Sequence, residues 1–352
     1  MRRRAVAFAL LAVASVAVPA VYVLRARRSA SERAGAVPST PLPPATEVSD
    51  LLRPPVAFRY TGSGDAYGLL VTADLGAPAR DETVTTLRCD RLDLAAGQGI
   101  CLTAERGVFT TYEAILFDAA FRVRHTLPLP GVPSRARVSP NGRLAAMTVF
   151  VSGHSYAAGQ FSTRTSIVDL DSGDVVVPDL ERFTVLRDGQ PIQGVDFNFW
   201  GVTFTRDGAR FYATLGTAGR QFLIEGDLKA QQARVLRADV ECPSLSPDNG
   251  RIAFKRREGG GLTPVTWRLS VLRLDTLEDW PLAESRSVDD QVAWLDDTAV
   301  LYALPAAATG TAATDTWTVP ADGGGTPRLV MPNAYSLVVV RGTASPPAHA
   351  ER

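Results

Sequence analysis

The sequence predicts an all-β fold: a six-bladed β-propeller preceded by an N-terminal transmembrane helix and a disordered tether. Three observations predict it: an apolar N-terminal segment flanked by arginines, a turn-and-strand unit that recurs along the chain, and a second recurring strand that ends in aspartate. The chain has 352 residues, enough for one large all-β domain. Its 29 glycines and 24 prolines suit many short strands joined by tight turns.

Residues 1–28 predict a signal anchor. Arginines at positions 2–4 precede an uncharged run at 5–24, and further arginines follow the run. Twenty helical residues reach roughly 30 Å, the thickness of the hydrocarbon core of a bilayer. A cleaved signal peptide is the alternative, because Val18-Pro19-Ala20 fits a small-residue cleavage site. The run is long for a signal peptide, so the sequence favours an uncleaved single-pass helix over a secreted form.

Residues 29–55 predict a disordered linker. Proline, alanine, serine and threonine dominate this stretch, so it cannot bury a core. We interpret it as a semi-extended tether between the membrane and the folded body. Residues 342–352 are expected to form a disordered tail, which leaves residues 56–341 for the propeller.

A tight turn followed by an apolar strand recurs through this body. One copy is Ser139-Pro140-Asn141-Gly142 before LAAMTVF, and another is Thr205-Arg206-Asp207-Gly208 before ARFYATL. Asn-Gly and Asp-Gly tolerate the positive φ of tight turns, so each unit predicts strand, turn and strand. Further copies begin at Ser246 (SPDNG) and Leu295 (LDD), and a looser copy begins at Leu92 (LDLAAGQG).

An apolar strand that ends in aspartate is the second repeat. It occurs six times, about 44 to 56 residues apart, which is typical of four-stranded propeller blades. The widest gaps fall where the segments GHSYAAGQFSTR and RDGQPIQGVDFNFW enlarge loops. The copies end at Asp74, Asp118, Asp171, Asp227, Asp275 and Asp322.

Interleaving the two repeats gives five complete blades and one split blade. The strand at 335–341 (YSLVVVR) has no hairpin partner after it, and the N-terminal strands VAFRYTG, YGLLVTADL and ETVTTL have no inner strand before them. Pairing these segments closes the ring and removes exposed sheet edges.

The units SPNGRLAAM and SPDNGRIAF resemble the WD-like repeats of the TolB β-propeller family, over most of residues 56–341. The runs VECPSLSPDNGRIAFKRR and SVDDQVAWLDDTAVLYALP are similar to bacterial envelope proteins of the TolB-like translocation class. The resemblance implies a propeller in the cell envelope that binds partners at the ends of its channel. The resemblance identifies the fold but gives little information about the function. The chain has only the anchor and tether where TolB has a separate N-terminal α/β domain, so the partner cannot be carried over.

Two surface features are candidate binding residues. The insertion that contains Phe197, Phe199 and Trp200 could supply aromatic interface anchors, or these side chains could fill the core of their blade. The acidic pair Asp289 and Asp290 is the second candidate. Its spacing matches no Ca²⁺ loop, and turns favour aspartate, so no metal site is predicted.

The sequence predicts neither catalytic residues nor a cofactor. Of three histidines, His154 alone stands in a long loop suited to catalysis, and its serine neighbours are too close in sequence for a nucleophile–base pair. The chain contains no Gly-x-Ser-x-Gly elbow. The run Lys255-Arg256-Arg257 is interpreted as a solvated strand edge.

Cys89 and Cys101 bracket a predicted hairpin, and a disulfide between them would form in an oxidising compartment. Ideal hairpin register places them a few residues out of step, so the pairing stays open at this point. Cys242 is predicted to be a small buried residue at the start of an inner strand.

Charge is balanced, with 37 basic and 37 acidic residues, so nothing points to a nucleic acid partner. We expect a non-enzymatic propeller, anchored in the cell membrane and held outside the cytoplasm, that binds an envelope protein or a cell-wall component. The alternative is a hydrolase or lyase that acts on envelope sugars or peptides inside the propeller channel. That activity requires clustered ionisable groups on the innermost strands, and the sequence reveals no convincing cluster.

Overall fold

The computed structural model of the chain describes residues 54–75, 82–151, 162–260, 263–306 and 313–341. These ranges contain 26 β-strands and one 3-10 turn, η1 (Leu180–Arg182), and no α-helix. None of the described residues belongs to a helix that is long and apolar enough to cross a membrane. The predicted anchor at 1–28, the linker up to residue 53 and the tail at 342–352 lie outside the described residues.

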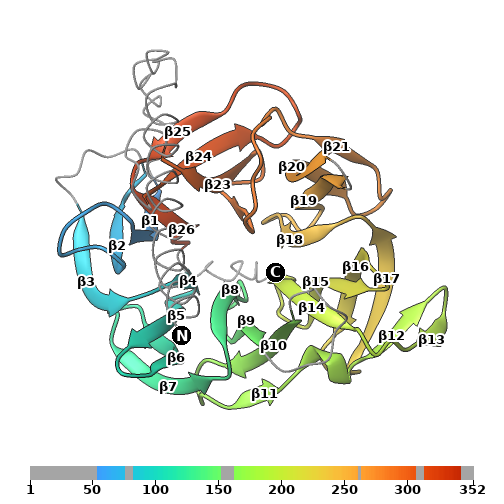
Figure 1. Ribbon diagram of the computed structural model, residues 1–352, viewed down its shortest axis with the longest axis horizontal. Helices are drawn as coiled ribbons and strands as arrows, with labels where there is room; N and C mark the ends of the chain where they lie inside the picture. Colours follow the sequence, from blue (N-terminus) through green and yellow to red (C-terminus); the bar gives the residue numbers. More distant parts are fainter. Residues whose placement is uncertain (1–53, 76–81, 152–161, 261–262, 307–312, 342–352) are drawn as a thin grey trace, which may run out of the picture. The chain divides into compact units, whose positions relative to one another are not determined.

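The strands form six sheets that stand as blades around a central channel (Figure 1), which confirms the predicted propeller. Four blades are antiparallel sheets of four consecutive strands, numbered here from the innermost strand outwards. Blade 1 is β4 (Arg91–Ala95), β5 (Gln98–Arg106), β6 (Thr110–Asp118) and β7 (Val123–Leu129). Blade 2 is β8 (Val132–Val138), β9 (Leu144–Val151), β10 (Ser162–Asp169) and β11 (Val175–Val177).

Blades 4 and 5 repeat this order. Blade 4 is β18 (Glu241–Leu245), β19 (Arg251–Gly260), β20 (Thr263–Arg273) and β21 (Asp279–Pro281). Blade 5 is β22 (Ala293–Trp294), β23 (Ala299–Pro305), β24 (Thr314–Pro320) and β25 (Arg328–Met331).

Blade 3 carries an extra hairpin on its outer edge. The outermost strand of its four-stranded sheet, β17 (Gln232–Ala238), pairs in parallel with β12 (Thr184–Arg187). Strand β12 in turn pairs with β13 (Gln190–Ile192), so the sheet has six strands. Of the insertion at 187–200 that the sequence assigned to an enlarged loop, residues 187–192 form the turn and second strand of this hairpin, and residues 198–200 begin the innermost strand. The hairpin projects from the ring (Figure 1). The strands are β14 (Asn198–Phe204), β15 (Arg210–Thr217), β16 (Arg220–Asp227), β17 (Gln232–Ala238), β12 (Thr184–Arg187) and β13 (Gln190–Ile192).

Blade 6 joins the two ends of the folded region. Its innermost strand is β26 (Ala334–Val339), which pairs antiparallel with β1 (Pro55–Tyr60). The outer strands β2 (Leu69–Asp74) and β3 (Thr83–Arg88) complete the sheet. This is the split blade that the sequence predicts.

The recurring turn has the same hydrogen bonds in three blades. In blade 2, the Ser139 hydroxyl donates to Asn141 Oδ1 (2.7 Å) and accepts from the Leu144 N–H (2.9 Å). Thr205 with Asp207 in blade 3, and Ser246 with Asp248 in blade 4, form the same pair of contacts. Each turn therefore satisfies its own backbone donors, which explains why this motif sets the start of each second strand.

Six hydrophobic clusters fill the molecule, one at each interface between neighbouring blades. The cluster between blades 2 and 3 includes Phe199, Phe204 and Phe211, each no more than 2% exposed. The cluster between blades 6 and 1 includes Phe117 and both Cys89 and Cys101. Because the core is divided among the interfaces, every blade depends on both neighbours.

Cys89 and Cys101 form a disulfide, with Cα atoms 5.3 Å apart. Cys89 lies between β3 and β4, where the chain passes from blade 6 to blade 1, and its N–H donates to the Gly68 carbonyl (2.9 Å). Cys101 lies on β5, opposite Leu92. Cys89 precedes β4 and takes no part in the pairing of β4 with β5. The register of that hairpin therefore does not prevent a bridge between Cys89 and Cys101.

We expect the double change Cys89→Ala and Cys101→Ala to lower the free energy of unfolding by about 3 kcal/mol, because the bridge restricts a short loop of the unfolded chain. Urea denaturation measures the difference. Dithiothreitol should shift the wild-type midpoint and leave that of the double variant in place. A wild-type midpoint that does not respond to reduction would contradict this role.

Candidate functional site

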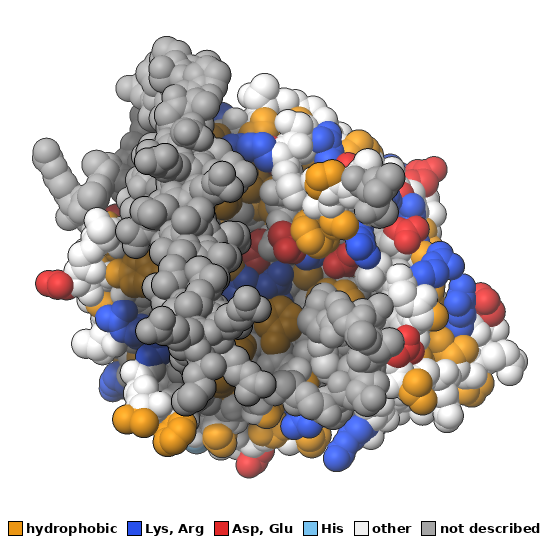
Figure 2. All heavy atoms as spheres, viewed as in Figure 1, with side chains coloured by type: hydrophobic (Ala, Val, Ile, Leu, Met, Phe, Trp, Pro, Cys, Tyr) orange, Lys and Arg blue, Asp and Glu red, His pale blue; other side chains and the backbone are white. Residues whose placement is uncertain are grey.

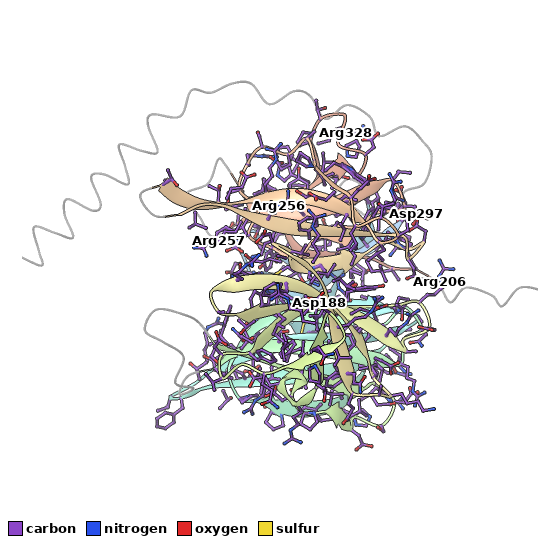
Figure 3. All side chains as sticks on the ribbon, turned by 90° about the vertical axis from the view of Figure 1, so that its right-hand side faces the viewer. Asp188, Arg206, Arg256, Arg257, Asp297 and Arg328 are labelled. Carbon is purple, nitrogen blue, oxygen red and sulfur yellow. A yellow bond between two sulfur atoms is a disulfide. The ribbon has the colours of Figure 1, made fainter. Side chains whose placement is uncertain are left out.

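The six innermost strands β4, β8, β14, β18, β22 and β26 enclose the channel. We call the end where these strands finish the turn face, because it carries the recurring turns. The opposite end is the hairpin face. Arg206 and Asp297 mark the turn face in Figure 3, and Arg257 lies towards the hairpin face. Figures 1 and 2 look onto the hairpin face.

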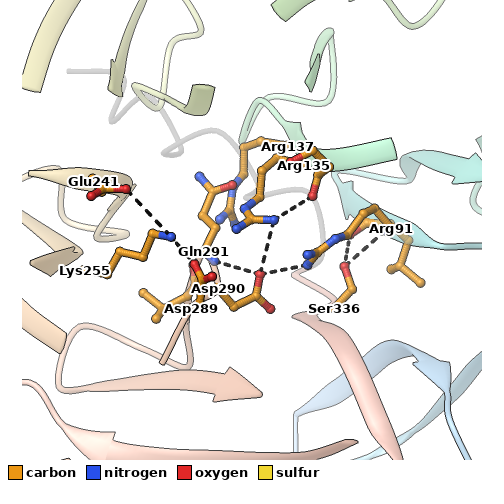
Figure 4. A network of polar contacts seen from close by, with 12 residues as sticks. Arg91, Arg135, Arg137, Glu241, Lys255, Asp289, Asp290, Gln291 and Ser336 are labelled. Atoms are coloured by element: carbon orange, nitrogen blue, oxygen red, sulfur yellow. Dashed lines mark hydrogen bonds and ion pairs between the residues drawn. The ribbon is translucent and has the colours of Figure 1, made fainter. Parts of the chain in front are cut away.

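Charged side chains meet inside the channel. The Asp290 carboxylate, which precedes β22, lies 2.8 Å from the Arg91 guanidinium of blade 1 and 3.8 Å from the Arg135 guanidinium of blade 2 (Figure 4). The Asp290 side chain is only 9% exposed. One carboxylate of blade 5 thus pairs with guanidiniums of blades 1 and 2 across the ring.

Two further side chains cross the channel at this level. Arg137 of blade 2 donates from Nη2 to the Val292 carbonyl (3.0 Å), which belongs to the opposite side of the ring. Gln291 donates from Nε2 to the carbonyls of Val202 (3.1 Å) and Pro243 (2.9 Å), on blades 3 and 4. We call Arg91, Arg135, Arg137, Asp290 and Gln291 the plug, because together they bridge the channel at mid-height.

A second ionic cluster lies beside the plug on blade 4. The Lys255 ammonium hydrogen-bonds to Asp289, lies 3.9 Å from a Glu241 carboxylate oxygen and sits 4.9 Å from the centre of the Trp267 ring. The Lys255 side chain is 5% exposed, so its interpretation as a solvated edge is wrong. Figure 2 shows acidic and basic side chains gathered in the hollow at the centre of this face.

Burial and neighbouring charges shift the pKa values of Asp290 in the plug and of Lys255 and Glu241 in the cluster beside it. Burial acts to raise the pKa of Asp290, but Arg91 and Arg135 outweigh it and the pKa lies below the usual value. Burial likewise acts to lower the pKa of Lys255, yet its neighbours, Cys242 and Asp289 foremost, hold that pKa above the usual value. For Glu241, burial prevails and raises the pKa.

On the turn-face side of the plug the channel widens into a cavity of about 440 Å³. Every blade contributes to its lining, so we call it the funnel. Its walls are mostly apolar, and small alanines leave the space open. The lining residues are Asp93, Leu94, Ala95, Ala96, Arg137, Val138, Pro140, Thr203, Phe204, Arg206, Ser244, Leu245, Ser246, Pro247, Asn249, Ala293, Trp294, Val338, Val339 and Arg341.

Three charged residues line the funnel from the plug to the turn-face end of β22, and together we call them the floor. Asp93 is buried and accepts a hydrogen bond from the Val138 N–H (2.7 Å). Burial raises the pKa of this carboxyl, although Arg137 and Arg341 act in the opposite direction. Arg341 donates from Nη2 to the carbonyls of Trp294 (2.8 Å) and Leu295 (3.1 Å). The funnel is therefore an apolar pocket with a polar, cation-rich floor.

The aromatic candidates lie in the core. Phe199 and Trp200 are on β14 and Phe197 just precedes it, and their exposed fractions are 1%, 7% and 9%. The rings of Phe197 and Phe199 meet edge to face, with centroids 6.2 Å apart. Their burial contradicts a role as exposed interface anchors, because β14 is an innermost strand packed on both sides by neighbouring blades.

The acidic pair Asp289 and Asp290 does reach the channel, but the two carboxylates have different partners. Asp290 is buried in the plug, and Asp289 is 55% exposed beside Lys255. Among the described residues, no three His, Cys, Asp or Glu side chains come together in a way that could hold a metal ion. Asp289 instead pairs with Lys255, and Asp290 pairs with Arg91 and Arg135.

The remaining candidates have structural surroundings. Cys242 is buried at the start of β18, as predicted. His125 lies on the outermost strand of blade 1, with Nε2 3.0 Å from the Asp171 carbonyl. His154 lies outside the described residues.

Sequence reasoning missed the cations of the channel. Arg91, Arg135 and Arg137 were not singled out, although a signal exists. Arg91 and Asp93, like Arg135 and Arg137, are two residues apart on short inner strands, so each pair shares one face of its strand. Charged residues repeated on one face of a strand that packs between blades indicate partners elsewhere in the ring.

No family model and no curated protein sequence matches this chain. Among solved structures, TolB from Acinetobacter baumannii is similar, with a TM-score of 0.54 and 16% identity over 81% of this chain and 66% of that chain. A puromycin-hydrolyzing peptidase of Mycobacterium tuberculosis has a TM-score of 0.49 and 15% identity, over 76% of this chain and 42% of that one. A putative TolB of Agrobacterium tumefaciens has a TM-score of 0.45 and 10% identity, over 80% and 90%.

At these identities the similarity establishes the fold: this chain has a TolB-like β-propeller. The chain spans 66% of the length of the Acinetobacter TolB chain. Function therefore has to be argued from the channel itself.

We expect Asp290→Asn to lower the free energy of unfolding by about 3 kcal/mol, because it leaves two buried guanidiniums without their carboxylate. The matched control is Asp188→Asn, which should cost less than about 1 kcal/mol because that side chain is exposed in the turn between β12 and β13. Urea denaturation at neutral pH compares the two. Equal losses would show that the plug carries no special stability.

The effect should also depend on pH. A carboxyl whose folded pKa is lowered stabilises the fold above its ordinary pKa of 3.8, and this stabilisation is lost as pH falls through the folded value. The gap between wild type and Asp290→Asn should therefore be complete at neutral pH and narrow below about pH 4. A gap that is constant down to strongly acidic pH would contradict the assignment.

Proposed function

We propose that this chain is a membrane-anchored, extracytoplasmic TolB-like propeller that captures an envelope protein or a cell-wall component in the funnel. The observation that carries the proposal is a pocket of about 440 Å³ that all six blades line and the plug closes from behind. A largely apolar concave site with a few convergent polar groups is the usual form of a binding pocket. Most of the residues that line it lie on strands, so the pocket is pre-formed.

The electrostatics of the channel favour binding over catalysis. A nucleophilic lysine requires a lowered pKa, whereas the pKa of Lys255 is raised by its acidic and thiol neighbours. Asp290 is likewise held as a carboxylate between two arginines. Both groups are thus held in ion pairs, as expected for side chains that fix the geometry of the channel.

The disulfide supports a location outside the cytoplasm. Cysteine bridges persist in oxidising compartments and are rare in the cytosol. The apolar run at 5–24, with arginines on both sides, supports an anchor on the same chain. We therefore infer a single-pass protein of the cell membrane with the propeller on the outer side.

The cysteines provide a test of this location. When the full-length chain is isolated from its envelope and denatured in the presence of a maleimide, one of its three cysteines, Cys242, should react. Prior reduction should expose all three. Mass spectrometry reads the number of adducts, and three adducts without reduction would place the propeller in a reducing compartment.

Filling the funnel should abolish capture. We expect Ala95→Trp to prevent retention of the envelope partner by the immobilised full-length chain, because the indole occupies space between blades 1 and 2. The control is Ala209→Trp, which adds the same side chain at an exposed position outside the funnel. Retained components are compared by mass spectrometry. A partner that Ala95→Trp still retains as well as Ala209→Trp does would exclude the funnel.

A second candidate function is a channel-sited hydrolase or lyase acting on envelope sugars or peptides. It is favoured by the ionisable groups that meet near the hairpin face, where burial raises the pKa of Glu241 towards that of a general acid. Incubation of wild type and Glu241→Gln with peptidoglycan fragments separates the two functions. Product that forms with wild type and not with Glu241→Gln would favour the enzyme.

A further inference from the structure

We propose that the funnel recognises the free C-terminal carboxylate of a peptide whose last residues are apolar. This inference rests on the proposed function, since it specifies the chemistry of the captured segment. It follows from an excess of cations in the funnel, from the partners those cations already have, and from the walls above them.

Positive charge exceeds negative charge in the funnel. Its lining includes three arginines, Arg137, Arg206 and Arg341, and one carboxylate, Asp93. Within the described ranges, none of the three guanidiniums lies within ion-pair distance of a carboxylate. The Asp93 carboxylate instead accepts from the Val138 N–H. The funnel thus retains net positive charge.

The two arginines of the floor are held by carbonyl groups alone. Arg137 uses Nη2 for the Val292 carbonyl, and Arg341 uses Nη2 for the carbonyls of Trp294 and Leu295. The Arg137 Nε is buried and has no hydrogen-bond partner among the described residues. A guanidinium has five N–H donors in a planar fork, so both side chains are fixed in place and still have donors to offer. That fork matches a carboxylate in geometry as well as in charge.

The walls fit aliphatic side chains. Val138, Phe204, Leu245 and Val338 are buried residues that line the funnel. Trp294 is 3% exposed, and its Nε1 donates to the Ser244 carbonyl (2.8 Å), which fixes the ring in the wall. A ligand that enters the funnel therefore meets apolar surface together with two fixed guanidiniums, that of Arg137 at the plug and that of Arg341 beside the end of β22.

A peptide end suits this arrangement better than an acyl chain. The rim at the turn face carries polar groups, among them Arg206 and Asn249. A peptide backbone leaving the funnel can form hydrogen bonds with such groups, whereas an acyl chain offers none. A volume of about 440 Å³ also lies in the range typical of pockets for small ligands, which suits a short peptide end.

The test uses a library of N-acetylated hexapeptides, randomised over apolar residues at the last four positions, prepared as free acids and as C-terminal amides. The immobilised full-length chain is exposed to both forms, and mass spectrometry quantifies what it retains. We expect the free acids to be enriched by about tenfold or more over the amides, because charge-assisted hydrogen bonds are lost on amidation. Equal retention of acids and amides, or retention of neither, would overturn the proposal.

Two variants locate the preference. Arg341→Gln and Arg137→Gln should each reduce the enrichment of acids over amides, and Arg143→Gln should leave it intact, because that side chain is 72% exposed and pairs with Asp169. Circular dichroism before and after heating verifies that each variant is folded. Enrichment that survives both floor variants would overturn the assignment of these arginines.

The outcome also separates this inference from the function on which it rests. If Ala95→Trp abolishes capture of an envelope partner but acids and amides are retained equally, the funnel binds partners without reading a carboxylate, and only this inference fails. If hexanoate or palmitate displaces the partner while no peptide is retained, the funnel binds an acyl chain and the peptide assignment is wrong. If Ala95→Trp leaves capture intact, the proposed function fails.

Discussion

The pairing of β26 with β1 is the constraint on which the rest of the structure depends. It joins the last strand to the first, so that β1 and β26 share one sheet and the six sheets close into a ring. Because the hydrophobic core is divided into one cluster per blade interface, an open ring would expose two of the apolar faces that closure buries. The disulfide from Cys89 to Cys101 strengthens the neighbouring passage from blade 6 to blade 1. Closure also brings Val338, Val339 and Arg341 into the funnel, so the same pairing that stabilises the fold completes the pocket.

The two ends of the channel have different physical characters because the plug divides them. Towards the hairpin face, acids and cations form ion pairs, and the pKa values of Asp290 and Lys255 move in the directions that preserve their charges, whereas burial raises that of Glu241. Towards the turn face, the walls are apolar and the cations of the floor have only carbonyl partners. An ion-pair network can fix the spacing of the blades, whereas a cavity lined by cations without carboxylate partners can accept an anionic ligand. This division is the basis for placing partner binding at the turn face.

Much of the fold was predictable, and much of the site was not. The turn beginning at Ser139, its copies at Thr205 and Ser246, and the aspartates that end the third strands are local signals, so they revealed the blades, their number and the split blade. The location of Phe199 and Trp200 was ambiguous, because a run of aromatic residues occurs both in exposed binding loops and in buried strands. Lys255 was misinterpreted because its partners, Asp289 and Glu241, come from other segments that only the ring brings together. The funnel has residues from six blades, and no local pattern encodes such a set.

Hydrogen–deuterium exchange of the full-length chain, with and without its captured partner, tests the central claim most directly. The account predicts slower exchange at the turns 139–142, 205–208 and 246–250 and along β4 and β26, all of which border the funnel or its mouth. The loop at 107–109 on the hairpin face should exchange at the same rate in both states. Protection confined to the hairpin face, with the turn face unchanged, would contradict the account, since the partner would then bind at the charged end of the channel.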